Sequence, residues 1–165
     1  MTITRIDHRR VLFQEIENHL LHDITPSNFL NSIRKRGDSK AHPFIMLYRL
    51  IETKQSPQHH PEGSVWNHTL LVTNEAAKVK NKNKDPKVFM WAALLHDIGK
   101  PPTTRTRKGK ITSYDHDKVG ADLAKEFVSE FTDDKDLIKR FGLLSDTICI
   151  FFMLTRTCPL QTSRV

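Results

Sequence analysis

The chain has 165 residues, 38% of them hydrophobic and 27% charged, which is ordinary for one soluble globular domain large enough to bury a core. Its formal net charge of +7 favours anionic ligands. No stretch approaches the ~20 apolar residues that a membrane span requires, and the first residues lack the apolar core of a secretory signal. The chain has only two cysteines, which argues against a disulfide scaffold. We therefore expect a cytoplasmic protein without a membrane partner.

Three helices are predicted before residue 54. Asp7 is a suitable N-cap for a helix that extends to about His22. Its apolar face would carry Val11, Leu12, Ile16, Leu20 and Leu21. Ser27 is the expected cap of a short helix ending near Gly37, and residues 43–53 form the third. Residues 55–63 are polar, with two prolines and a glycine, so they should form a loop.

Two helices are predicted on either side of a short polar linker. Residues 65–79 have helical apolar spacing, and residues 80–85 should carry that helix into solvent. Pro86 can begin the next helix, since its missing N–H is no loss there. The segment 98–102, with one glycine and two prolines, should end it.

The rest of the chain predicts one small departure from helix. Residues 103–114 alternate around Lys108-Gly109 and should form a short hairpin or an ordered loop. Helices are expected over 117–131 and from 137 onward. The predicted fold class is therefore all-α. We expect a single domain over 1–165, with N-terminal helices in 1–54, a metal-binding core in 55–140 and an atypical tail in 141–165.

The most informative feature is the His96-Asp97 pair. It closes an apolar run, residues 89–95, and a glycine turn follows directly. Burying an imidazole and a carboxylate together is costly unless each has a partner, and a divalent cation is a partner for both. The pair therefore indicates half of a metal site.

Two other histidines are candidates for the second half. His68 lies near the start of one helix and the pair at the end of the next, so an antiparallel arrangement would bring them together. His116 begins the helix after the hairpin. The alternatives are a surface histidine at 68 and an ordinary helix N-terminal residue at 116. His59 and His60 are flanked by prolines and should be loop or supporting residues.

Three ordered segments carry a family resemblance: residues 60–72, 92–100 and 116–121. Together they resemble the HD-domain superfamily of metal-dependent phosphohydrolases. The match is nearest to the HD domain attached to bacterial tRNA nucleotidyltransferases and to stand-alone bacterial HDIG proteins. In strong form it extends over 55–131, and it implies a helical HD-domain bundle.

The resemblance implies a site and a reaction. His68, His96 and Asp97 correspond to the first three metal ligands, and His116 to a histidine used in two-metal members. One or two divalent ions (Mn, Fe, Mg, Ni, Co or Zn) would activate water to hydrolyse a nucleotide or another phosphate mono- or diester. Asp97 would bridge metals or orient that water, and Lys100 would contact the phosphate or remain a solvated lysine.

Basic residues form two clusters, residues 78–87 and 105–110. The second follows the His-Asp pair, and Arg105, Arg107 and Lys110 are further candidate phosphate contacts. The alternative is that these charges only solvate the surface. Neither cluster contains an aromatic residue, so no base-stacking platform is predicted. RNA remains a candidate partner beside a small phosphorylated substrate, and oligomeric state is left open.

The end of the chain departs from the family's pattern. No histidine follows His116, and the closing aspartate ligand would have to be Asp146, for which an ordinary polar position on the last helix is the simpler interpretation. Back-translating residues 146–165 with a one-base shift gives a segment that resembles the missing one. We hypothesise that the chain from about Phe141 is an out-of-frame product; the alternative is a divergent but genuine C-terminus. Missing ligands would favour a second function, a catalytically impaired module that binds RNA or nucleotide.

Overall fold

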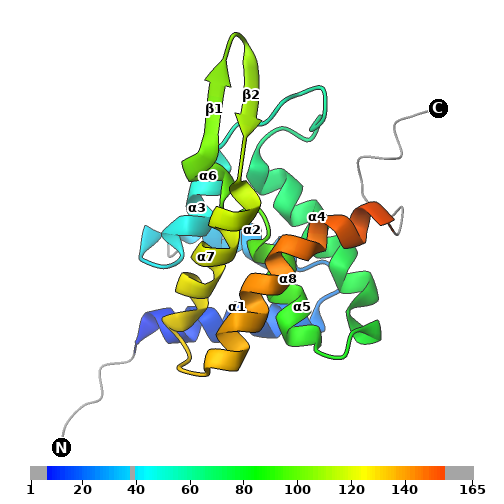
Figure 1. Cartoon of the computed structure of the whole chain (residues 1–165). Helices are drawn as coiled ribbons and strands as arrows, with labels where there is room; N and C mark the ends of the chain where they lie inside the picture. Colours follow the sequence, from blue (N-terminus) through cyan, green and yellow to red (C-terminus); the bar gives the residue numbers. More distant parts are fainter. Residues whose placement is uncertain (1–6, 38–39, 155–165) are drawn as a thin grey trace, which may run out of the picture.

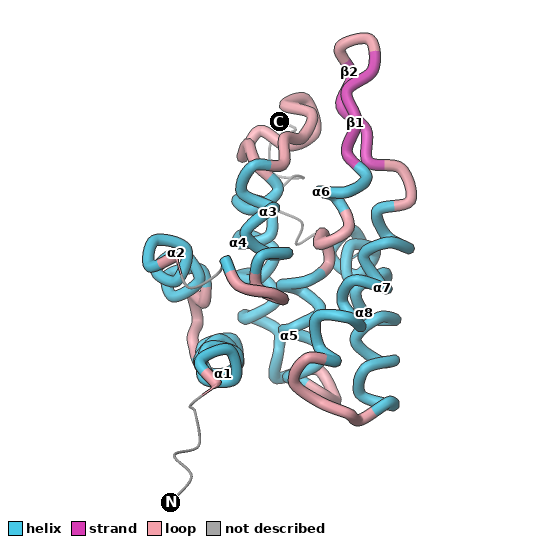
Figure 2. Tube along the Cα trace, turned by 90° about the vertical axis from the view of Figure 1, so that its left-hand side faces the viewer, coloured by secondary structure: helices cyan, strands magenta, loops and turns pink. Residues whose placement is uncertain are grey.

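The computed structural model describes residues 7–37 and 40–154, without the side chains of 145–154. It is a helical bundle from which one small antiparallel hairpin projects (Figures 1 and 2). This confirms the predicted all-α class and the hairpin within 103–114. The elements are α1 (His8–His22), α2 (Ser27–Arg36), α3 (Ile45–Glu52), α4 (Val65–Val79), η2 (Lys80–Lys82), α5 (Pro86–Leu95), α6 (Lys100–Thr103), β1 (Thr104–Arg107), β2 (Lys110–Ser113), α7 (His116–Ser129) and α8 (Lys135–Leu154).

Helix α5 is the centre of the core. All its residues from Val88 to Leu95 are buried, because the helix is apolar on every side. It packs against α4, α8 and α1. Trp91 stacks on Phe13 with ring centroids 4.5 Å apart, and its indole N–H donates to Glu17 at 3.1 Å. No helix within the described residues is long and apolar enough to cross a membrane.

Local sequence signals set several helix ends. Asp7 caps α1 by accepting the backbone N–H of Arg9, and Gly37 ends α2 with φ +78°. Ser27 is the first residue of α2 and not its cap; its side chain accepts a hydrogen bond from Asn74 on α4. The prediction for Val11 was also wrong, because this residue is 42% exposed.

Lys80 corrects the prediction that residues 80–85 lead into solvent. Its side chain is buried, and Nζ donates to the backbone carbonyls of Leu20 and Asp23 at 3.2 and 2.8 Å. These carbonyls lie at the C-terminal end of α1, where a helix has unpaired acceptors and attracts positive charge. Lys80 thus joins the end of α4 to the end of α1.

The turn after α5 places the His-Asp pair just beyond the helix. α5 ends at Leu95, so His96 and Asp97 lie in the turn and not in the helix itself. The two prolines expected only to end α5 also form the first turn of α6, where proline is tolerated. In the hairpin that follows, Thr104 pairs with Ser113 and Arg107 with Lys110.

Gly99 lets this turn approach α7 at backbone distance. A Cβ atom at Gly99 would overlap the carbonyl oxygen of His116 and the backbone nitrogen of Gly120. The φ of Gly99 is −81°, so what requires glycine here is space and not backbone conformation. The contact fixes Asp97 relative to His116.

We expect Gly99→Ala to lower the free energy of unfolding by about 2 kcal/mol, because neither backbone can give way easily. Gly120→Ala is the matched control. A Cβ there meets atoms at 3.4 Å or more, and alanine favours a helix interior, so stability should change by less than about 1 kcal/mol. Urea unfolding measures both. Equal stability of the two variants would show that the approach at Gly99 is unimportant.

Candidate metal centre

His68, His96 and Asp97 converge where α4 meets the turn after α5. His68 lies in the first turn of α4, capped by Ser64, and the pair follows the last residue of α5. One side-chain ligand atom from each of the three lies within 4.8 Å of the others, and all three residues are buried. The structure therefore brings together the three residues that the resemblance grouped.

Hydrogen bonding fixes where the proton of His96 lies. Its Nδ1 is 2.8 Å from the carbonyl oxygen of Ala93, which can only accept, so Nδ1 carries the hydrogen. Nε2 therefore presents a lone pair, 3.3 Å from Oδ2 of Asp97. Two acceptors face each other, and neither His96 Nε2 nor either Asp97 oxygen has a hydrogen-bond partner among the described residues.

Two more imidazoles repeat this arrangement. Nδ1 of His68 donates to Glu62 at 2.8 Å, which leaves its Nε2 lone pair 3.9 Å from Asp97 Oδ2. Nδ1 of His116 donates to the carbonyl of Ser113 at 2.7 Å, and its Nε2 is 3.9 Å from Asp97 Oδ1. Three nitrogen lone pairs thus surround one carboxylate. A cation would satisfy all of them, and the donor set fits a divalent metal.

Lys100 occupies the polar edge of this cluster. Its Nζ is 2.8 Å from Asp97 Oδ2 and donates to Gln55 Oε1 at 2.9 Å, and its side chain is only 11% exposed. The alternative of a solvated lysine is therefore wrong.

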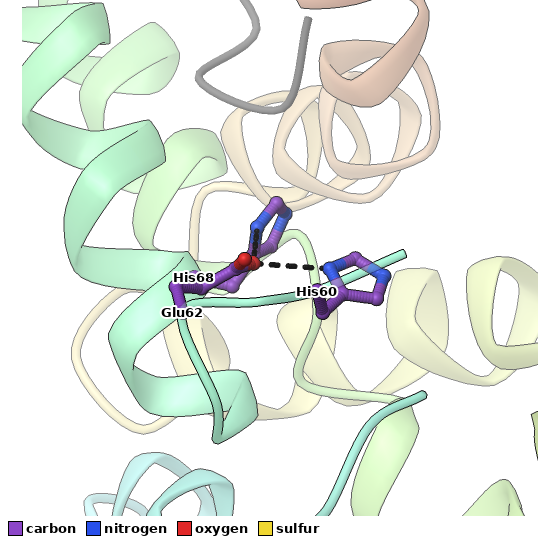
Figure 3. A group of neighbouring side chains, drawn as sticks. All are labelled: His60, Glu62 and His68. Carbon is purple, nitrogen blue, oxygen red and sulfur yellow. Dashed lines mark hydrogen bonds and ion pairs between the residues drawn. The ribbon is translucent and has the colours of Figure 1, made fainter. Parts of the chain in front are cut away.

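Sequence reasoning missed Glu62. In Figure 3 its carboxylate lies between His60 and His68, and Oε1 accepts from both Nδ1 atoms, at 3.0 and 2.8 Å. Its other oxygen is buried without a partner among the described residues. His60 supports the cluster from the loop, as expected, whereas His59 is exposed. An acidic residue in the loop just before the helix of His68 was the available signal.

The remaining candidates lie elsewhere. Arg105, Arg107 and Lys110 are exposed on the hairpin, outside the buried cluster. The side chain of Asp146 is not described, and the same holds for the other side chains of 145–154 and for all of 155–165 in the tail to which the frame-shift hypothesis applies.

Electrostatics keep the buried groups in ligand form. Burial lowers the pKa of His68 to about 4, and the neighbouring His96 adds to the effect, so His68 is neutral at pH 7. Burial alone would raise the pKa of Asp97, but His96 and Lys100 hold it well below its usual range. A neutral His68 beside an ionised Asp97 is the state that metal binding requires of these two groups.

Comparison with known proteins gives one family. A family model described as HD domain matches residues 65–147, which include His68, His96, Asp97 and His116. The chain is 34% identical over 119 residues to the multifunctional CCA protein of Actinobacillus pleuropneumoniae serotype 5b (72% of this chain, 28% of that protein). It is 28% identical over 137 residues to that of Hahella chejuensis (82% and 26%). The chain thus spans about a quarter of these relatives.

The low pKa of His68 predicts a pH dependence for the metal-free protein. An unfolded histidine takes up a proton near pH 6.5, and folded His68 only near pH 4. The unfolded chain therefore binds more protons in this window, and stability should fall by up to about 3 kcal/mol as the pH decreases through it. His68→Gln should flatten the slope, whereas the control, exposed His22→Gln, should not. Stability is measured by denaturant unfolding of chelator-treated protein at a series of pH values. If the slope of stability against pH were the same in His68→Gln as in the wild type, the low pKa assigned to His68 would be wrong.

Proposed function

The chain belongs to the HD domain family, and from that premise we propose that it is a metal-dependent phosphohydrolase. Its substrates would be phosphate mono- or diesters, nucleotides first among them. The observation that carries the proposal is the buried Asp97 carboxylate facing the Nε2 lone pairs of three histidines. Such an arrangement is electrostatically costly unless a cation completes it.

The residues that would hold the metal are His68, His96 and Asp97, with His116 available to a second ion. Imidazole nitrogens with a carboxylate oxygen suit manganese, iron, cobalt, nickel or zinc, and magnesium less well because it prefers oxygen ligands. When bound, the metal supplies Lewis acidity and a water of lowered pKa.

The chain's own groups supply the other requirements. Lys100, at the edge of the cluster, is placed to contact phosphoryl oxygens and to offset their charge. Asp97 has two buried oxygens, so one can orient the attacking water while the other serves as a ligand. The side chain of His116 is 34% exposed, against 7% for His68 and 0% for His96, so His116 is the histidine that a substrate arriving from solvent would meet first.

A second candidate function is a module that binds RNA or nucleotide without efficient turnover. It is favoured by the basic hairpin and by the departure of the C-terminal segment from the family's pattern. Metal-stimulated turnover decides between the two, since only the phosphohydrolase requires it.

We expect divalent metal to stimulate hydrolysis of bis-p-nitrophenyl phosphate or a nucleoside monophosphate, and His96→Ala to lower the rate about 100-fold or more, because a buried ligand is lost. His59→Ala is the matched control, since His59 is an exposed histidine of the adjoining loop. Rates are measured with Mn²⁺, Co²⁺, Ni²⁺ or Zn²⁺ added to chelated protein. Equal rates for wild type and His96→Ala would refute the proposed activity.

Glu62→Gln tests the supporting carboxylate. The substitution keeps the size but removes the charged acceptor that orients His68, so metal affinity should fall about 10- to 100-fold with little change in fold. Isothermal titration with Zn²⁺ or Mn²⁺ measures this. Glu75→Gln is the control, because Glu75 is on the same helix as His68 and pairs with Lys78 at the surface. Unchanged affinity in Glu62→Gln would assign Glu62 no role at the metal.

A further inference from the structure

The strand register gathers positive charge on one face of the hairpin. Side chains alternate along a strand and paired residues share a face, so Arg105, Arg107 and Lys110 lie on the same side together with Thr112. All three cations are exposed. Figures 1 and 2 show the hairpin projecting beyond the helices, which leaves this face open.

This charge is uncompensated. The segment 104–113 contains four cations, Lys108 included, and no acidic residue. Arg107 and Lys110 lie directly opposite each other, an arrangement that destabilises a two-stranded sheet. Within the described part of the chain neither has an ion-pair partner, whereas Lys118 and Lys125 on α7 pair with Asp115 and Asp122. An anion bound here would remove the repulsion.

The base of the hairpin is joined to the candidate metal centre. The Thr104 hydroxyl donates to the carbonyl of Lys100 at 2.7 Å, and the Thr104 and Ser113 hydroxyls hydrogen-bond to each other at 2.7 Å. The Ser113 carbonyl in turn accepts from His116. The hairpin therefore continues directly into the turn of Lys100 at one strand and into His116 at the other.

An aromatic side chain at this junction indicates the kind of polyanion. Tyr114 lies between Ser113 and the start of α7 and is 76% exposed. Sequence reasoning excluded a stacking platform from within residues 105–110, but the ring stands just outside that cluster. A tyrosine beside a row of cations is the combination that binds single-stranded nucleic acid, by base stacking and phosphate contacts. The face offers no apolar anchor for a membrane, and an acidic peptide has no base to stack.

We propose that the hairpin face of Arg105, Arg107 and Lys110, with Tyr114, binds single-stranded nucleic acid and directs it to the candidate metal centre. The inference rests on the proposed function only in the statement that the strand is directed to a site that hydrolyses phosphate esters. Binding itself needs no turnover.

Fluorescence anisotropy with a labelled ten-nucleotide single strand, as RNA and as DNA, tests the proposal in chelator with the full chain. The triple variant Arg105→Ala, Arg107→Ala, Lys110→Ala should bind at least about tenfold more weakly. Its slope of log K against log salt should be shallower by about 2, at roughly 0.7 per phosphate contact. The control triple variant Lys82→Ala, Lys84→Ala, Lys139→Ala removes equal charge from exposed positions outside the hairpin and should bind like wild type.

Tyr114 gives a second, charge-neutral test. Tyr114→Leu should weaken oligonucleotide binding about fivefold or more, and Tyr114→Trp should restore it, because an aromatic ring and not a hydroxyl is required. Circular dichroism establishes that each variant is folded. Binding of RNA, of DNA or of both supports the proposal, and the ratio of the two affinities tells whether RNA or DNA is preferred.

Three results would overturn it: equal weakening by both triple variants, no weakening by the hairpin variant, or tighter binding of a poly-glutamate peptide or phosphatidylserine vesicles than of either oligonucleotide. Absence of metal-stimulated hydrolysis would refute the proposed function and leave this result intact. Conversely, a hairpin without effect on binding leaves the phosphohydrolase proposal standing.

Discussion

The buried carboxylate of Asp97 is the constraint on which the rest of the site depends. Lys100 cannot satisfy its surroundings alone. Lys100 forms an ion pair with Asp97 Oδ2 and donates a hydrogen bond to Gln55, whereas three imidazole Nε2 atoms also face the carboxylate. A metal ion with several coordination positions can satisfy all these acceptors. The energetic cost of burying these polar side chains is therefore offset only when one cation contacts all of them.

The fold delivers these ligands through contacts that carry no chemistry of their own. Gly99 allows the turn of Asp97 to touch α7 at backbone distance, and the carbonyl of Ser113 then fixes the ring of His116. On the other side, Glu62 fixes the ring of His68. Each imidazole thus has its Nδ1 proton engaged by the protein, which aims Nε2 inward before any ion arrives. Such preorganisation limits the reorganisation that binding would require.

The features that could be predicted from the sequence are those caused by residues close to them in the chain. The bounds of α4 and α5 follow from capping residues and apolar spacing, signals that lie within a few residues of each helix end, and both were predicted closely. Lys80 was not, because its partners are carbonyls about sixty residues away on α1. Glu62 was missed although its partners His60 and His68 are only two and six residues away. Its position just before α4 was a signal, but its contact with both imidazoles is set only when the loop folds back onto the helix.

Charged groups occur in two different environments in this chain, the buried cluster around Asp97 and the exposed hairpin. At the buried cluster, low dielectric makes each unpaired polar atom and each charge costly, so the imidazoles, the Asp97 carboxylate and the Lys100 ammonium must lie close together. On the hairpin, cations stand in water without acidic partners, where they cost little and their field extends over about a Debye length, roughly 8 Å at physiological salt. A surface of this kind attracts a polyanion but cannot cleave it, and a buried cluster can act on a phosphate but attracts it only at short range. Thr104 hydrogen-bonds to the carbonyl of Lys100 and the Ser113 carbonyl accepts from His116, so the basic hairpin and the buried cluster belong to one continuous piece of structure.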